Sequence, residues 1–417
     1  MWAYSNPVRI EFGAGAVTRL AGLIGKRRWA LVTYDLPLFR ELAAGIRAEV
    51  GPPVATIDNI VTNPDVKDLA QSCRLFGATS PKPEVIVALG GGSIIDAAKV
   101  VAASQGDFPL VLASLTGGAG LDGATFTPII AVPSTAGTGS EVTSWATVWD
   151  QESGNKYSLA HRALYPETAL VDPVLTIGAP RGLTLATGLD ALSHALESIW
   201  NVSANPISAS FAVAAAREIM EVLPRLVDDL ANANLRERQA RASLMAGLAF
   251  SNTKTALAHN ISYDITLRAG TIHGIACSFS LPTVMRWSLG HSAECDAYLR
   301  RIFGDDLAAG AGRLTTFLEG LGVSTDPASY DLSPGGLAGT GHEGLARGTR
   351  TQLHRSARSG CLRGRSNAWR VRSLLSSMDG ATSGLRRRPS SSASTAPSLD
   401  TSSRQSKRAW HRTLRAS

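Results

Sequence analysis

Cysteine is scarce in this chain of 417 residues, and its four cysteines lie far apart. Cys73, Cys277, Cys295 and Cys361 form no C-x-x-C pair. This spacing argues against a disulfide framework and against a zinc site built from thiolates. We therefore expect reduced thiols, most of them buried.

Long apolar runs and a secretory leader are also lacking. No apolar run reaches the roughly 18 residues that a membrane-spanning helix needs. The first residues, Met1 to Arg9, do not combine a basic segment with an apolar one, which predicts a cytoplasmic protein. At 417 residues the chain exceeds the size at which a single core stops growing, so we expect two domains.

A net positive charge is absent from most of the chain and arises at one end. The net charge is +7, yet residues 341–417 hold 16 of the 41 Lys and Arg and only 3 of the 34 Asp and Glu, so the rest is mildly acidic. Lys407 is the one lysine among those 16 cations. Almost no hydrophobic periodicity remains there, which is typical of disorder and of GC-rich coding sequence translated out of frame. A nucleic-acid-binding arm is the alternative, and the missing aromatic interleaving disfavours it.

Short apolar runs alternate with helical patterns over residues 1–178. The runs are continuous and rich in β-branched residues, which predicts parallel strands buried on both faces. These strands are expected at 29–33, 85–89, 129–132 and 169–171, with helices at 64–78 and 94–104. The alternation predicts an α/β, Rossmann-like N-terminal domain.

Strand signals stop after residue 173. Helical patterns then follow one another at 183–200, 207–231, 236–251, 255–268 and 275–289. Glycine and proline within 177–180 mark a boundary between domains. We therefore expect an all-α second domain over 179–330, followed by an aberrant, basic, disordered tail over 331–417.

Two loops of small residues follow predicted strands. The first, Gly90 to Ser93, separates strand 85–89 from a helix, and the second, Pro133 to Glu141, follows strand 129–132. Glycines at a strand-to-helix turn let a pyrophosphate approach the backbone N–H groups. The first loop alone is also compatible with a purely structural turn, since it is not G-x-G-x-x-G. Together the two loops predict a dinucleotide site.

Asp35 follows the strand at 29–33 and bears on the choice of cofactor. A carboxylate at this place is suited to bond a ribose 2′-hydroxyl and to repel a 2′-phosphate, which favours NAD over NADP. A solvated turn residue is the alternative interpretation.

Four residues of types that can ligate a metal lie in or beside the predicted helices. Asp190 and His194 are four positions apart, so they share one helix face. His259 and His273 lie further along, and the chain has only eight histidines. Each has an ordinary structural explanation when taken singly. One oxygen and three nitrogens together suit Fe²⁺ or Zn²⁺ with a position left open for substrate.

With these motifs the chain resembles the iron-dependent (group III) alcohol dehydrogenase family from residue 6 to about residue 326. The resemblance implies that Asp190, His194, His259 and His273 hold the metal, and that the two loops bind NAD or NADP. The positions expected to contact the cofactor are Asp35, Gly90, Gly91, Gly92, Ser93, Asp96, Thr135, Thr138, Gly139, Ser140 and Lys156.

Residues 255–263 and 273–282 look most like phosphonoacetaldehyde reductases, which implies 2-hydroxyethylphosphonate as the product. Tyr263 stands where many members have a second histidine, so it either relays protons or simply packs. A dianionic phosphonate requires cations near the metal. Lys254, Arg162 and Arg268 are the candidates, with solvated surface charge as the alternative reading of each.

The reaction that the resemblance implies is hydride transfer from the nicotinamide to an aldehyde polarised by the metal. We expect small aldehydes or alcohols and a second copy of the chain as partners, and neither nucleic acid nor membrane. Another aldehyde of the lactaldehyde or butanol type, or an inactive product, is the alternative. A lyase like dehydroquinate synthase shares the fold, but the D-x3-H pair argues against it.

Overall fold

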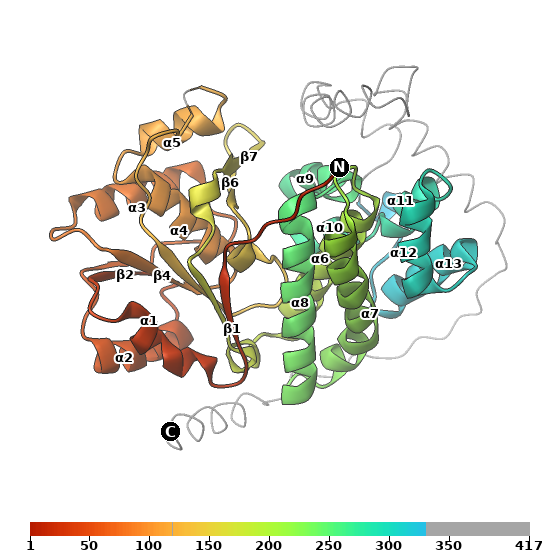
Figure 1. The fold of residues 1–417 in the computed structure, drawn as a ribbon, viewed down its shortest axis with the longest axis horizontal. Helices are drawn as coiled ribbons and strands as arrows, with labels where there is room; N and C mark the ends of the chain where they lie inside the picture. The colour runs from red at the N-terminus through yellow and green to blue at the C-terminus, as the bar shows by residue number, and fades with distance from the viewer. Residues whose placement is uncertain (119, 331–417) are drawn as a thin grey trace, which may run out of the picture.

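The computed structural model describes residues 1–118 and 120–330. Figure 1 shows two halves: a sheet with the helices that cover it forms one half of the molecule, and a bundle of helices forms the other. The predicted tail at 331–417 lies outside the described residues. Within the described part, no helix is long and apolar enough to cross a membrane.

Six parallel strands form the main sheet, in the order β1-β8-β5-β4-β2-β3. They are β1 (Arg9–Phe12), β2 (Trp29–Val32), β3 (Ala55–Ile57), β4 (Val85–Gly90), β5 (Ile129–Pro133) and β8 (Thr168–Val171). The four predicted strands are all present. The two that the sequence pattern missed, β1 and β3, are short edge strands with partly exposed residues, so neither is a continuous apolar run.

Helices cover both faces of this sheet. Alternate residues of a strand point to opposite faces, so Ala30 and Val32 of β2 join one core while Trp29 and Leu31 join another. The first core packs under α3 (Val66–Ala78), α4 (Gly92–Ser104) and α5 (Phe108–Leu115), and the second under α1 (Leu20–Ile24) and α2 (Pro37–Val50). The predicted α/β fold is confirmed.

An antiparallel hairpin departs from the expected all-parallel architecture. Its strands are β6 (Trp145–Asp150) and β7 (Asn155–Ala160). Trp145 and Thr147 of β6 are half-buried and Asp150 ends the strand, so the hairpin lacks the continuous apolar run that marks the buried strands. Figure 1 shows the hairpin between the sheet and the helices.

The described chain beyond residue 180 is helical. It contains α6 (Arg181–Trp200), α7 (Pro206–Asp228), α8 (Ala233–Thr253), α9 (Leu257–Ala269), α10 (His273–Ala276), α11 (Leu281–Ser288), α12 (Ala293–Phe303) and α13 (Leu307–Gly320). Short 3-10 turns occur at 16–19, 140–142, 162–164, 173–176 and 327–330. The expected single helix at 275–289 is wrong: it divides into α10 and α11, because Pro282 fits only in the first turn of a helix. The predicted domain boundary at 178 stays a prediction.

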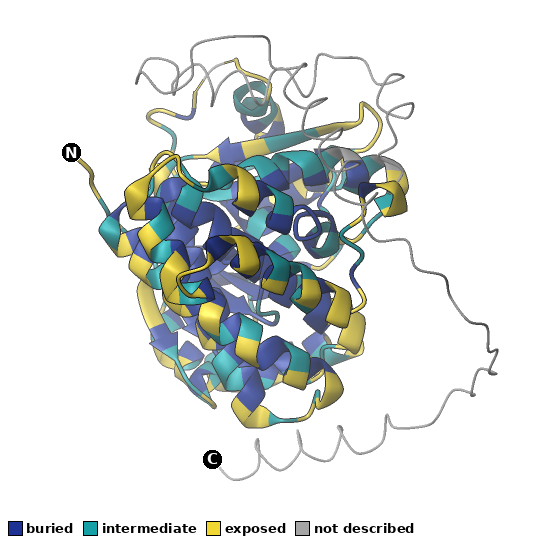
Figure 2. Ribbon diagram, turned by 90° about the vertical axis from the view of Figure 1, so that its right-hand side faces the viewer, coloured by how far each residue is buried: buried dark blue, intermediate teal, exposed yellow. Residues whose placement is uncertain are grey.

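Helix α6 lies at the centre of the helical half. From Gly188 to Ile199 every residue is buried, polar ones included. Figure 2 shows this interior in blue, surrounded by helices whose outer faces are exposed. A helix buried all round needs an internal partner for each polar group, and these partners define the site.

The N-terminal segment ties the two halves together. The Tyr4 hydroxyl donates to the Leu248 carbonyl at 3.1 Å, and the Asn6 amide donates to the Val142 carbonyl at 2.9 Å. The Ser5 N–H donates to Asn252 Oδ1 at 2.9 Å. In Figure 1 the segment runs from β1 over α8 toward α9.

Candidate metal and cofactor site

Helix α6 supplies two of the four predicted metal ligands. Asp190 and His194 are separated by one turn, and both are almost fully buried, at 4% and 5% exposure. His194 Nε2 lies 3.7 Å from Asp190 Oδ1. The i, i+4 spacing thus places both groups on the same face, as expected.

The other two histidines converge on the same carboxylate oxygen. His259 comes from the first turn of α9, and its Nε2 lies 3.4 Å from Asp190 Oδ1. His273 begins α10, and its Nε2 lies 3.9 Å from that atom. Four ligands bonded at about 2.0–2.1 Å around a tetrahedral ion are about 3.4 Å apart. The spacing of these atoms therefore suits a metal ion between them.

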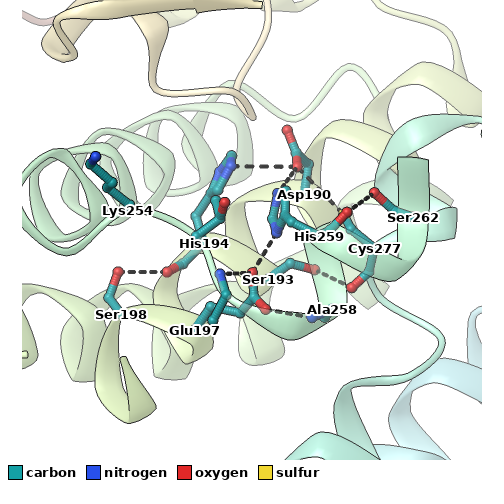
Figure 3. Close-up of polar contacts among 12 residues, drawn as sticks. Asp190, Ser193, His194, Glu197, Ser198, Lys254, Ala258, His259, Ser262 and Cys277 are labelled. Carbon is teal, nitrogen blue, oxygen red and sulfur yellow. Dashed lines mark hydrogen bonds and ion pairs between the residues drawn. The ribbon is translucent and has the colours of Figure 1, made fainter. Parts of the chain in front are cut away.

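Glu197 orients one of these ligands, although the sequence reasoning assigned it no role. It lies one further turn along α6, is fully buried, and its Oε2 is 2.6 Å from His259 Nδ1 (Figure 3). Its oxygens also accept the N–H groups of Ala256 and Ala258 at 3.0 and 2.6 Å. With Nδ1 bonded to a carboxylate, Nε2 is the nitrogen left for a metal. The sequence did contain a signal for this role, because Asp190, His194 and Glu197 are spaced i, i+4, i+7 and so share one face of α6.

The electrostatics of the cluster fit a cation. His259 Nε2 is buried and has no hydrogen-bond partner among the described residues. Burial lowers the pKa of His194 to about 4 and that of His273 to about 3, which leaves neutral imidazoles with free lone pairs. Burial would raise the pKa of Asp190, but the neighbouring imidazoles lower it below its usual value. The carboxylates of Glu197 and Asp190 outweigh burial and raise the pKa of His259 to about 10, so its imidazole has to release a proton to bind a metal. Three imidazole nitrogens and an ionised oxygen then form a suitable donor set for Fe²⁺ or Zn²⁺.

Cys277 lies beside this cluster and was not predicted to do so. Its Sγ is 3.5 Å from Asp190 Oδ1, and with Asp190, His259 and His273 it forms a group whose possible ligand atoms lie within 4.8 Å of one another. Burial raises the pKa of the thiol well above its ordinary value, so it donates to the carboxylate. An isolated cysteine in a sequence carries no signal for such a position.

Aromatic rings from both halves of the molecule surround the histidines. Phe250 of α8 stacks on His194, with centroids 4.0 Å apart and planes at 7°. Trp149 of β6 meets the edge of His273 at 6.5 Å, and Tyr263 lies parallel to that imidazole at 6.3 Å. The hairpin therefore packs against the imidazole of His273, and α8 packs against that of His194.

A cavity of about 340 Å³ joins the metal cluster to the predicted cofactor loops. Among the residues lining it are all four predicted metal ligands together with Gly92, Ser93, Asp96, Thr138, Ser140, Lys156, Lys254 and Tyr263. The structure thus brings most of the predicted site residues into one space. Gly90, Gly91, Thr135 and Gly139 belong to the loops that flank it.

The three candidate substrate cations have different positions. Lys254 lines this cavity. Arg162 instead lines a second, separate hollow beside Tyr165 and Glu167, so its position does not support the predicted contact with substrate. The side chain of Arg268 lies outside the described residues.

The two cofactor loops are joined by a buried network. Asp96 accepts hydrogen bonds from the Ser140 hydroxyl at 2.5 Å and from the Thr147 N–H at 2.9 Å. Lys99 is fully buried and donates to the Ser140 carbonyl and hydroxyl, to Thr143 and to the Trp145 carbonyl. Both oxygens of Asp96 are thus used within the protein, which indicates that this residue shapes the cofactor loop.

Glycine is required where the loops meet. A Cβ on Gly92 would lie 2.5 Å from Thr138 side-chain atoms, so the loops approach more closely than any other residue allows. Gly92 is the first residue of α4, and Gly92 and Ser93 line the cavity. The N-terminus of a helix has free backbone N–H groups that can bind an anion. The packing accordingly suits a pyrophosphate, as the loop pattern predicts.

Asp35 and Lys156 were both expected to contact the cofactor. Asp35 follows β2 beside the position where the strand order reverses, where α/β folds bind ligands. It is exposed, and its carboxylate pairs with Arg40 at 2.5 Å. Lys156 of β7 places its ammonium 4.0 Å above the Tyr263 ring, at the metal end of the cavity. The contacts of Asp35 and Lys156 with a cofactor therefore stay predictions.

Comparison with known proteins agrees with this geometry. Residues 7–173 match the family described as iron-containing alcohol dehydrogenase, and residues 184–341 match the C-terminal part of the same family. An NAD-dependent methanol dehydrogenase from Bacillus methanolicus is 33% identical over 75% of this chain and 84% of its own length.

Two further relatives act on aldehydes that carry an acidic group. A phosphonoacetaldehyde reductase from Streptomyces viridochromogenes is 35% identical over 63% of this chain and 67% of its own length. The structure of a sulfoacetaldehyde reductase from Bifidobacterium kashiwanohense in complex with NAD⁺ superposes with a TM-score of 0.76 at 29% identity. It covers 84% of this chain and 92% of that one. The chain belongs to the iron-containing alcohol dehydrogenase family and is an oxidoreductase that acts on alcohols.

Proposed function

We propose that this enzyme reduces a short aldehyde with NADH or NADPH, and that phosphonoacetaldehyde, which yields 2-hydroxyethylphosphonate, is its preferred substrate. The observation that carries the proposal is the single cavity shared by the four predicted ligands and the two cofactor loops. Hydride transfer requires the reacting carbons close to contact. A common cavity makes that approach available.

Asp190, His194, His259 and His273 would hold the ion. An Fe²⁺ or Zn²⁺ ion there supplies a Lewis acid for the aldehyde oxygen. Zinc binds such a set more tightly than ferrous iron, so supply in the cell decides the native metal.

The remaining residues position the cofactor and supply a proton. The network of Asp96 and Lys99 fixes the loop around Thr138 beside the metal cluster. Reduction of RCHO by NAD(P)H consumes one proton and yields RCH2OH and NAD(P)⁺. We assign the delivery of that proton to the Tyr263 hydroxyl, which lines the cavity, or to water.

The choice of phosphonoacetaldehyde rests on two supports. Relatives named for phosphonoacetaldehyde and sulfoacetaldehyde fall within the same family. A lysine, Lys254, also lines the cavity that holds the ligand cluster. Because other relatives are named for 1-propanol and 1,3-propanediol, a neutral aldehyde of the lactaldehyde or butanal type is the second candidate.

A substrate scan tests the proposal. The full chain, loaded with Fe²⁺ or Zn²⁺, would be assayed for oxidation of NADH and NADPH with phosphonoacetaldehyde, lactaldehyde, butanal and methylglyoxal. We expect the highest kcat/KM with phosphonoacetaldehyde. A preference for butanal would replace that substrate assignment. No turnover of any aldehyde by folded, metal-loaded protein would favour the inactive product instead.

The cofactor form and the assembly stay predictions within this proposal. NAD is favoured over NADP by the position of Asp35 after β2. A homodimer in the cytoplasm is the expected state, and sedimentation of the purified chain would test it. The out-of-frame origin of residues 331–417 is tested by translating the other two frames of the source DNA: a helical continuation should appear in one.

A further inference from the structure

The backbone at Lys254 has a conformation that lysine rarely adopts. Lys254 ends α8 with φ 68° and ψ 175°. This combination is essentially confined to glycine, because a Cβ crowds the neighbouring peptide groups. Gln105 is also at positive φ but has the better tolerated left-handed helical values of 48° and 22°. The strain at Lys254 is therefore of a different kind.

The turn around Lys254 is held by bonds that a glycine would make equally well. The Lys254 N–H donates to the Phe250 carbonyl at 2.8 Å, and its carbonyl accepts from the Thr253 hydroxyl at 3.0 Å. Asn201 Nδ2 reaches the same carbonyl and that of Thr255, at 3.4 and 3.3 Å. Each of these bonds uses a backbone atom of residue 254 or 255, so the fold alone does not call for a lysine side chain at 254.

The ammonium of Lys254 has no internal partner. Among the described residues no hydrogen bond or ion pair to its Nζ is found, and the side chain is exposed. It lines the cavity of the metal cluster, and Figure 3 shows it on the His194 side of that cluster. The turn is also anchored to the site, because Phe250 stacks on His194 and Glu197 accepts the Ala256 N–H.

The charges that line the cavity leave this ammonium free for a ligand. Asp96 bonds inside the protein, and the Asp190 carboxylate faces the three imidazoles. Lys156 has its ammonium over the Tyr263 ring, and we predict that it contacts the cofactor. Lys254 therefore lines the cavity with an ammonium group that has no structural partner among the described residues and no predicted contact with the cofactor.

We propose that Lys254 is a specificity-determining residue that binds the terminal oxyanion of a short aldehyde while its carbonyl reaches the metal cluster. The substrate class is then a short aldehyde with a phosphonate, sulfonate or carboxylate end. This inference rests on the proposed reductase function and deepens it. Strain at a functional position persists when the surrounding structure over-determines it, and the four hydrogen bonds at residues 254 and 255 do so here.

The proposal predicts opposite effects of one substitution on stability and on selectivity. Lys254→Gly should raise the thermal midpoint, since glycine adopts this conformation without strain. The same variant should raise KM for phosphonoacetaldehyde and sulfoacetaldehyde about tenfold, with kcat nearly unchanged. Activity with propanal, a neutral aldehyde of similar length, should stay within about twofold. Lys254→Met should show the same loss of selectivity without the gain in midpoint.

Matched controls separate the local charge from net charge. Lys26 is exposed and does not line the cavity, so Lys26→Met should leave every parameter unchanged. Raising the salt concentration should weaken wild-type selectivity for the anionic aldehydes and leave that of Lys254→Met unaffected, because screening acts on exposed charges. The apparent KM for NADH should be equal in all variants.

Several results would overturn the inference. Equal losses with propanal and with the anionic aldehydes would make Lys254 a structural residue, and a raised KM for NADH would assign it to the cofactor. Good turnover of propanal with no preference for either anionic aldehyde in the wild type would reject the inference and leave the reductase function standing. Calorimetric binding of 2-hydroxyethylphosphonate to metal-loaded chain with NAD⁺ decides the matter without turnover: equal affinity of the wild type and Lys254→Met refutes the role.

Discussion

At the scale of single residues, the site depends on groups that do not touch the ion themselves. Glu197 is the main one, because its carboxylate bonds His259 Nδ1 at 2.6 Å and also fixes the first turn of α9. A carboxylate on the far nitrogen of a ligating histidine fixes its tautomer and orientation. Metal affinity should therefore respond to Glu197 without any change in the ligands.

We predict that Glu197→Gln weakens Zn²⁺ binding by about 10- to 100-fold. The amide presents an N–H group to donors that need an acceptor, so one of the present bonds is lost. Competition with a chromogenic chelator measures the dissociation constant of the full chain. Ser193→Ala is the control, since it removes another buried polar group of α6, which donates to the carbonyls of Leu189 and Cys277 and not to a histidine. Equal affinities of Glu197→Gln and wild type would contradict the positioning role.

Lys99 leads to a prediction about pH. Burial lowers its pKa to about 8, against the pull of Asp96 and Glu141. Between pH 8 and the ordinary pKa of lysine near 10.5, the unfolded chain binds the proton and the folded chain releases it. Stability contributed at this position therefore rises with pH across that window. Denaturant unfolding at pH 7.5, 9 and 10 should show the free energy of unfolding of the wild type rising relative to that of Lys99→Met. A difference between the two proteins that stays constant with pH would refute the lowered pKa of Lys99.

At the scale of elements, α6 positions the site because helices pack closely around it. α10, which carries His273, is placed by Gly274, where a Cβ would overlap the Ala186 carbonyl of α6. His273 can reach Asp190 only while α10 stays in this contact. The packing of two helices thus sets the fourth ligand.

We predict that Gly274→Ala destabilises the protein by about 1–3 kcal/mol, the usual cost of overpacking, and weakens Zn²⁺ binding. The added methyl group has to push α10 away from α6, and His273 moves with it. Gly312→Ala in α13 is the control: no atom lies within 4 Å of its Cβ position, so the change should be neutral or stabilising. Thermal unfolding and chelator competition measure both effects. If Gly274→Ala were destabilised but bound Zn²⁺ as tightly as the wild type, the contact between α10 and α6 would not set the position of His273.

At the scale of the whole molecule, the cavity is assembled from two halves that differ in architecture. The sheet half contributes the predicted cofactor loops and the β6–β7 hairpin, and the helical half contributes the predicted metal ligands. All four ligands belong to α6, α9 and α10, so a bound ion joins helices that the sheet does not connect. Metal binding should then appear in the stability of the chain.

We predict that Zn²⁺ at 100 times its dissociation constant stabilises the folded chain by about 2.7 kcal/mol, as mass action requires. Differential scanning calorimetry with and without the ion would measure the rise in midpoint. His273→Ala should lose most of that rise, whereas Arg162→Ala, which lines a different hollow, should keep it. An equal rise in both variants would place the ion elsewhere.

The sequence by itself indicated the class of enzyme and the succession of a sheet half and a helical half. Continuous apolar runs identified the four central strands because those strands are buried on both faces. Asp190, His194, His259 and His273 could be predicted as metal ligands because the chain has few residues of ligand type, and the structure brings them together. Tertiary structure decided which residues support them. Glu197, Phe250 and Trp149 act through contacts between elements distant in the chain. The β6–β7 hairpin and the strained Lys254 depend on packing and backbone angles, which no local residue pattern encodes.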